Sequence, residues 1–282
     1  VLKPGALDLR IELANTANVF SDATPQTSVT MKFESIRSGV FLRYGVTDRL
    51  EMAVEVPVVN RYRGIMEGMI SAVERATTGL APDRRALKGT GYAYQVTSGG
   101  RTVINAREGV VGLGDASIMG KYQVLTETSS LPALSFRAAL KLPTGDESHL
   151  LGSGSPDYGF GLAVEKHVAK DWMVYANLNG VIPTGHIAGF GLQPVVSALI
   201  AVEYLWSENF SIVGHLDYFS SPLYGTGTHV FDKGVTEGVL GFSYRLRPQL
   251  LWQVYAVENL DFIVGSAADF TLSTVVTFQF GS

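Results

Sequence analysis

The sequence predicts an all-β chain that forms a transmembrane antiparallel up-and-down β-barrel of about 12 strands. Three observations support this: apolar and polar residues alternate with period two, short and long connections alternate, and charges gather on one face of the strands. The alternation is clearest over residues 270–282, FTLSTVVTFQFGS. One face there carries Leu272, Thr274, Val276, Phe278 and Phe280, and the other carries Ser273, Val275, Thr277 and Gln279.

Length and composition fit one barrel domain over residues 1–282, although one or two soluble domains would also fit 282 residues. Charged residues make up only 17%, and the net charge of −4 excludes the basic footprint that a nucleic-acid partner requires. The chain has no cysteine and no uninterrupted run of about 20 apolar residues. Only transmembrane helices and closed β-barrels satisfy all their backbone hydrogen bonds in lipid. Without a candidate helix, a membrane-spanning form of this chain must be a closed barrel. No signal peptide opens the sequence, so we expect a mature form.

Twelve segments carry the strand pattern, and the connections between them are alternately short and long. We expect the short ones to be periplasmic turns and the long ones extracellular loops, which places both termini on the periplasmic side. Pro57 interrupts the third segment, where we expect a bulge or an early strand end. The segments are 6–18, 30–46, 50–63, 113–125, 132–143, 158–169, 172–184, 195–206, 210–222, 235–247, 250–263 and 269–280.

All three tryptophans flank predicted short turns and share the parity of the apolar face. Trp172 follows one turn, Trp206 precedes a second and Trp252 follows a third. Tryptophan favours the membrane–water interface, where its ring is apolar and its N–H stays wet. We therefore expect an interfacial girdle at the periplasmic rim.

Charged residues fall on the strand face opposite the apolar one, and a barrel turns that face toward its lumen. We favour a network of ion pairs that stiffens a narrow barrel, with a charged constriction as the functional alternative. The mixture of signs argues against strong ion selectivity. The expected lumen residues are Arg10, Glu12, Arg37, Arg43, Glu51, Glu55, Arg137, Lys141, Glu203, Asp217, Glu237 and Arg245.

The second long loop, residues 64–112, is an insertion far longer than a connection requires. Helical spacing predicts an amphipathic helix over 65–78, and a hairpin is expected from 92–97 and 102–106 around Gly99-Gly100. A lumen of 12 strands is narrow, so this loop could fold inward as a gate or plug; the alternative is that it packs outside on other loops. The gate residues would be Ile65, Met66, Met69, Ile70 and Val73.

Three glycine-rich motifs occur in order: Gly112-Leu113-Gly114-Asp115, Lys141-Leu142-Pro143-Thr144-Gly145-Asp146, and Gly152-Ser153-Gly154-Ser155-Pro156-Asp157-Tyr158. Their order resembles the outer-membrane channel-like family associated with bacterial phenol and aromatic-compound degradation, and a neighbouring uncharacterised outer-membrane barrel family. The resemblance covers about residues 112–176 and implies a monomeric barrel that passes small, hydrophobic or aromatic molecules. Locally, Asp115 can bind turn amides, and the glycines permit left-handed turns. The aromatic terminal strand resembles the signal that outer-membrane assembly machinery reads.

Catalytic, metal and cofactor sites are not expected. Nothing in the sequence brings a serine to any of the five histidines, and His149 with Asp146 and Glu147 has no specific metal-ligand spacing. We expect a passive channel of the bacterial outer membrane, with lipid, lipopolysaccharide and small solutes as its partners. The alternatives are a lipid-modifying enzyme, a structural or docking barrel without an open pore, and a soluble β-sandwich.

Overall fold

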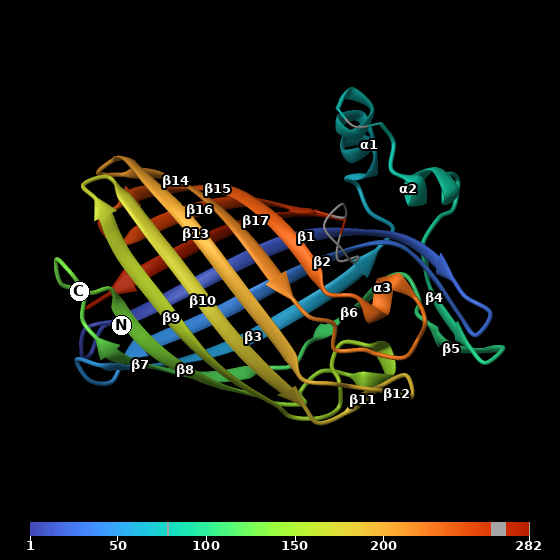
Figure 1. Cartoon of the computed structure of the whole chain (residues 1–282), viewed down its shortest axis with the longest axis horizontal. Coiled ribbons are helices and arrows are strands. Elements are labelled where there is room, and N and C mark those ends of the chain that lie inside the picture. The colour runs from blue at the N-terminus through green and yellow to red at the C-terminus, as the bar shows by residue number, and fades with distance from the viewer. Residues whose placement is uncertain (78, 261–268, 282) are drawn as a thin grey trace.

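Twelve antiparallel strands close into a barrel in the computed structural model, which describes residues 1–77, 79–260 and 269–281 (Figure 1). The barrel closes where β1 pairs with β17, from Leu7 opposite Phe280 to Ala17 opposite Phe270. The predicted fold is confirmed. The wall consists of β1 (Leu7–Ala23), β2 (Thr27–Gly45), β3 (Leu50–Tyr62), β6 (Val110–Leu113) with β7 (Ser117–Leu125), β8 (Ala133–Lys141), β9 (Asp157–Ala169), β10 (Trp172–Pro183), β13 (Val195–Ser207), β14 (Phe210–Phe219), β15 (Val235–Arg247), β16 (Leu250–Asn259) and β17 (Phe270–Phe280).

Both termini lie at the short-turn end of the barrel, and the remaining elements gather at the long-loop end (Figure 1). Within the described residues, no helix is long and apolar enough to cross a membrane. The predicted strand over 235–247 coincides with β15. The predicted strands over 210–222 and 250–263 extend beyond the observed ends of β14 and β16. Residues 261–263 of the latter lie outside the described part. The elements at the long-loop end are α1 (Glu67–Ala76), α2 (Pro82–Ala86), β4 (Ala93–Ser98), β5 (Arg101–Asn105), a 3₁₀ turn (Glu147–His149), β11 (His186–Ile187), β12 (Phe190–Gly191) and α3 (His229–Asp232).

The first long connection is not a loop, contrary to the expectation from the sequence. β1 and β2 continue as a hairpin past the rim and turn over only residues 24–26, where Thr24 Oγ1 accepts the backbone N–H of Gln26 and Thr27. The extension persists because β4 pairs with residues 27–32 of β2 and so satisfies backbone groups that would otherwise form an open edge. The predicted hairpin of the second loop, β4–β5, is confirmed and supplies this edge partner.

Pro57 does not end or bulge β3, which corrects the prediction for this strand. The irregularity lies in the neighbouring strand, which breaks between β6 and β7. Glu55 pairs with Ser117 and Val58 with Leu113, so two residues of β3 face three of its neighbour. Because proline cannot donate a ladder hydrogen bond, the partner gains an extra residue opposite it. This bulge contains Asp115.

The two strand faces are chemically separate, as predicted. Outward-facing apolar side chains remain widely exposed; Leu240, for example, is 66% exposed. Inward-facing Asp8, Glu51 and Ser135 are buried instead. A water-soluble protein would cover so continuous an apolar surface, whereas a barrel in lipid exposes it. The exposed set includes Ile11, Leu13, Val40, Leu42, Val54, Phe136, Phe160, Leu178, Ile200, Leu216, Leu240 and Leu272.

We expect Leu240→Arg to lower the free energy of unfolding by about 2–4 kcal/mol, because it places a charge within the apolar belt. The matched control is Gln253→Arg, which adds the same charge to the lumen-facing side of β16. Urea unfolding in lipid vesicles measures both. Equal losses of stability in the two variants would contradict the assignment of faces.

Candidate functional site

Part of the predicted ion-pair network exists on the wall formed by β1, β2, β3 and β8. Arg37 pairs with Glu55, and Arg43 pairs with Asp8 and, at 3.7 Å, with Glu51. Arg10 reaches Glu12 on its own strand at 3.2 Å. At the long-loop end of β8, Lys141 lies 3.0 Å from Asp115 and 2.5 Å from Asp157.

The remaining predicted lumen residues do not form the expected arginine–carboxylate pairs. Arg137 Nη2 donates to Asn179 Oδ1 at 2.8 Å, and Arg245 Nη1 donates to the Pro248 carbonyl at 3.1 Å. Glu203 accepts hydrogen bonds of 2.5 Å from Tyr175 and Ser211, both neutral hydroxyls. The network is therefore local to one wall.

The acidic wall lies on β13, β14 and β15. Asp217 pairs there with His215 at 2.9 Å, and Glu237 is its directly registered neighbour on β15. Apart from Arg245 on β15, the predicted lumen cations lie on the strands from β1 to β8, so cations are distributed unevenly around the lumen. The period-two alternation within each strand predicts that these residues face the lumen. It does not predict how the charges of different strands are distributed around the lumen.

A cavity of about 520 Å³ lies against the basic wall. Its cations are Arg10, Arg43, Lys121 and Arg137, and Glu51 is its one carboxylate within the described residues. The remaining lining is uncharged and mostly apolar or small: Phe41, Ala53, Met119, Gly120, Ala138, Ala139, Gly159, Phe160, Gly161, Asn179, Gly180, Val181 and Ser197. The cavity thus combines positive charge with apolar surface.

Lys121 was absent from the lumen residues predicted from sequence. Its neighbours Ile118 and Tyr122 are exposed on the outer face, so the period-two pattern assigns Lys121 to the lumen. Strict application of strand parity could have found Lys121. The same parity places Asp8 on the lumen face with Arg10 and Glu12, and the structure agrees, since Asp8 is only 2% exposed and pairs with Arg43.

An apolar cluster joins the loops at the long-loop end. Its buried centre consists of Val29 on β2, Val96 on β4 and Ile104 on β5, with Val96 fully buried. Partly buried residues from other loops pack against this centre, so the hairpin β4–β5 links the loop layer to the barrel. They are Met31, Tyr94, Leu150, Ala188, Phe190, Val230 and Phe231.

The predicted gate helix corresponds to α1, which protrudes beyond the outline of the barrel (Figure 1). Met66 and Ile70 are buried against Ala17 and Phe270, on the outer side of the wall. Ile65, Met69 and Val73 are exposed, Ile65 by 80%. The helix therefore packs outside the barrel here, and a gating role for these five residues stays a prediction.

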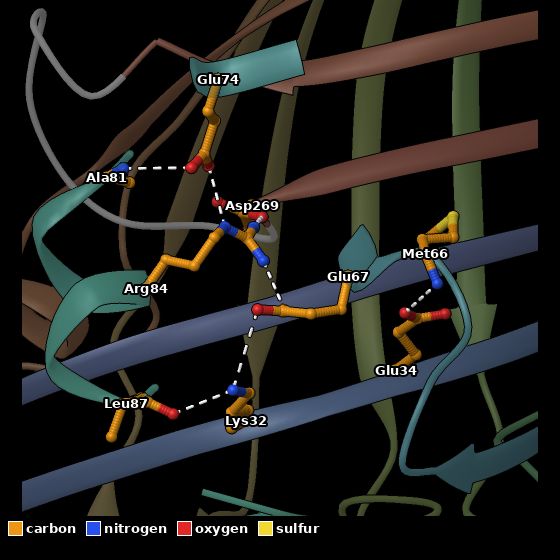
Figure 2. Close-up of polar contacts among 9 residues, drawn as sticks. All are labelled: Lys32, Glu34, Met66, Glu67, Glu74, Ala81, Arg84, Leu87 and Asp269. Carbon is orange, nitrogen blue, oxygen red and sulfur yellow. Dashed lines mark hydrogen bonds and ion pairs between the residues drawn. The ribbon is translucent and has the colours of Figure 1, made fainter. Parts of the chain in front are cut away.

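A buried arginine holds α1 and α2 together beside the wall (Figure 2). Arg84 of α2 donates to Glu67 at 2.5 Å and to Glu74 at 2.9 Å, and it also binds Asp269. Burial alone would lower the pKa of Arg84, but these carboxylates, Asp269 foremost, raise it above its usual value. Lys32 of β2 adds a contact of 2.9 Å to the Leu87 carbonyl.

Glu34 is the second anchor of this segment, and it projects from the outer side of β2. It is 3% exposed, and Figure 2 shows its carboxylate beside the backbone N–H of Met66, which donates at 2.7 Å. Asn15 and Tyr62 donate to the other oxygen at 2.9 and 3.0 Å. Gly64 has a φ of +103°, and a Cβ there would clash with Glu34. Sequence parity would have placed this carboxylate in lipid, and only the folded loop explains it.

The glycine-rich motifs form the base of the third loop. Asp115, in the bulge beside Pro57, accepts the backbone N–H of Gly145 at 2.9 Å and of Ser153 at 3.0 Å. A Cβ on Gly152 would lie 2.2 Å from Asp115 Oδ1, so glycine is needed for this close approach. The expectation that Asp115 binds turn amides is confirmed.

The third loop does bring a serine to a histidine, contrary to the sequence expectation. Ser148 Oγ lies 3.1 Å from His149 Nδ1, and the same nitrogen lies 2.7 Å from Asp146. A catalytic triad needs serine and carboxylate on opposite ring nitrogens, so this is not a proton relay. Hydrogen bonds from Ser148 and His149 lower the pKa of Asp146 to about 2, as expected for a capping carboxylate. The described residues contain no cluster of three or more histidine, aspartate or glutamate side chains that could hold a metal ion.

The three tryptophans lie at the short-turn end as expected. Trp172 packs against Tyr204 with the rings tilted and their centroids 4.8 Å apart, and Tyr204 contacts Trp206 edge-on at 6.0 Å. Trp252 Nε1 donates to Thr274 Oγ1 at 2.8 Å. Their membership of a membrane-interface girdle stays a prediction.

We expect Arg84→Met to destabilise the packing of α1 and α2 on the wall by roughly 3–5 kcal/mol, because it leaves three carboxylates without their shared cation. Arg85→Met is the control, since Arg85 is exposed on the same helix. Limited proteolysis of residues 64–92 and hydrogen exchange measure the effect. Equal protection of the two variants would show that Arg84 does not hold this segment.

Comparisons with known proteins agree with the architecture. The crystal structure of the COG4313 outer membrane channel from Pseudomonas putida F1 matches with a TM-score of 0.63 and 16% identity, over 99% of this chain and 97% of that one. The KdgM porin matches with a TM-score of 0.50 and 10% identity, over 98% and 99%. The NanC porin matches with a TM-score of 0.50 and 9% identity, over 98% and 100%.

At these identities the likeness establishes the fold, that of an outer-membrane β-barrel. A search of curated proteins finds no match. The model of the family described as "Protein of unknown function (DUF3187)" matches residues 1–280. Because this match covers nearly the whole sequence, the chain belongs to the DUF3187 family.

Proposed function

We propose that the protein is a passive outer-membrane channel for small molecules, including hydrophobic and aromatic ones. The observation that carries this proposal is the lumen cavity of about 520 Å³, which joins apolar side chains to charged ones. Pockets of about 300–1,000 Å³ accommodate small organic molecules. The charged residues keep the lumen wet, while Phe41 and Met119 offer surface to an apolar solute.

The route into the lumen starts in the loop layer. A second cavity of about 720 Å³ lies there, lined by Ile104, Leu150 and Ala188 among others. Ser153 also lines this cavity, and its hydroxyl accepts a hydrogen bond from Lys141 of the barrel wall. A solute that crosses this contact passes from the loop layer toward the basic wall. The apolar cluster around Val96 acts as the gate, since it binds the loops to one another.

The solved structures of similar fold support a channel, because they are an outer membrane channel and two porins. The earlier resemblance to the channel family associated with phenol degradation points to the same class of solute. A lipid-modifying enzyme lacks support because Ser148, His149 and Asp146 do not form a relay. The remaining alternative is a docking barrel without an open pore, and a transport assay distinguishes it from a channel.

We further propose that the barrel is a monomer in lipid and lipopolysaccharide. The apolar belt would contact acyl chains, and Trp172, Trp206 and Trp252 would lie at the periplasmic interface. The terminal strand β17 would be read by the outer-membrane assembly machinery, since its outer face carries Phe278 and Phe280.

We expect liposomes containing the protein to swell with small sugars, amino acids and aromatic alcohols. Val96→Asp should raise the rate severalfold, because it buries a carboxylate in the apolar cluster and separates the loops. Val73→Asp is the control, since it places the same charge on the exposed face of α1. Resistance of the folded barrel to sodium dodecyl sulfate without heating verifies that both variants are folded.

If no liposomes swell, whether they contain the wild-type protein or either variant, the proposed channel is refuted. Faster swelling with Val73→Asp but not with Val96→Asp would move the gate to α1, as the sequence first suggested.

A further inference from the structure

We propose that Lys121 and Arg137 form a binding subsite in the lumen for the carboxylate of a small organic acid with an apolar body, such as an aromatic monocarboxylate. This inference rests on the proposed channel function and names its substrate class. It depends on where these two cations lie and on the absence, among the described residues, of an ion pair to either of them.

The two cations occupy directly opposite positions on adjacent strands. Lys121 of β7 is registered with Arg137 of β8, and both side chains line the lumen cavity. Like charges that face each other across two strands are unfavourable. An anion bound between them relieves this repulsion and accepts hydrogen bonds from both.

Neighbouring carboxylates are engaged elsewhere. Glu51 is registered with Lys121 on the other side, but its two oxygens contact Arg43 at 3.7 Å and the backbone N–H of Leu2 at 2.9 Å. Asp8 also binds Arg43. Among the described residues, neither Lys121 nor Arg137 forms an ion pair, and Asn179 is the one side chain that hydrogen-bonds to Arg137.

Small side chains leave room beside these cations. Ala139, Gly159 and Gly161 line the cavity next to Arg137. A Cβ on Gly161 would lie 2.2 Å from Asn179 Oδ1, so glycine allows Asn179 to reach Arg137 across β9. Asn179 thereby fixes one edge of the guanidinium and leaves the other N–H groups for a ligand.

An apolar surface completes the subsite. Phe41 and Met119 line the same cavity, and the Arg10 guanidinium lies over the Phe41 ring at 5.0 Å. A ring or short alkyl chain can contact this surface while its carboxylate lies between Lys121 and Arg137. Lys121 and Arg137 repel a cation at this place, and Glu203, Asp217 and Glu237 on the facing strands repel the second carboxylate of a dicarboxylate.

The test is block of single-channel current in potassium chloride by benzoate, with benzyl alcohol as the neutral molecule of similar shape. We expect benzoate to interrupt the current at lower concentration than benzyl alcohol. The variant Lys121→Gln/Arg137→Gln should raise the half-blocking benzoate concentration about tenfold or more, as expected for loss of charged hydrogen bonds. Arg245→Gln is the control, since Arg245 faces inward but lies outside the cavity.

Equal block by both molecules, or an unchanged benzoate block in the double variant, would overturn the subsite. A wild-type protein that conducts no current would refute the channel instead. Benzoate binding is then measured by titration calorimetry in detergent. If the protein in detergent binds benzoate, and the double variant binds it more weakly, the subsite is supported even without a channel. If benzoate does not bind, the subsite is overturned.

Discussion

The hydrogen-bonded closure of β1 onto β17 is the constraint on which the rest of the structure depends. In hydrocarbon every backbone group needs a partner within the protein, so a sheet without an edge is the one β-structure that is stable there. Closure also fixes which side chains face outward. Leu9 lies opposite Phe278 and Ile11 opposite Val276 on the apolar face, while Arg10 lies opposite Thr277 on the lumen face. A shift by one residue would exchange the two faces and place charge in lipid.

The lumen properties follow from this closure. Positively and negatively charged residues share a narrow interior, and those near Arg43 form ion pairs with one another. The strands β7, β8 and β9 differ, because Arg137 is registered with Lys121 and Gly161, and neither cation forms an ion pair among the described residues. The result is local positive charge beside open volume. In the proposed channel, the loop layer controls access to it through apolar packing around Val96. The polar anchors Glu34 and Arg84 hold α1 outside the wall.

Much of the barrel could be predicted from the sequence, because alternation with period two is imposed by the membrane on each strand separately. The strands from 158 to 207 follow their predicted ranges within one residue. Features set by contacts between distant segments could not be predicted. The extension of β1 and β2 depends on pairing with β4, and the bulge at Asp115 depends on Pro57 in the neighbouring strand.

The same distinction holds for the site. Parity assigned Arg137 to the lumen, but the expected carboxylate partner depended on the register between strands, where Arg137 faces Lys121 and Gly161. The loop helix was recognised from its spacing. Its position outside the wall depends on Glu34 and Arg84, whose partners are far away in sequence.

Side chains face lipid and lumen alternately along each strand, and spin labels measure this directly. The natural absence of cysteine allows single nitroxide labels at Val196 and Leu178, which face outward, and at Ser197 and Asn177, which face inward. Collision rates with lipid-soluble oxygen and with a water-soluble nickel chelate are compared in lipid vesicles. The account predicts that oxygen collides preferentially with labels at 178 and 196 and the chelate with those at 177 and 197. Equal accessibility at all four positions, or the opposite order, would contradict it.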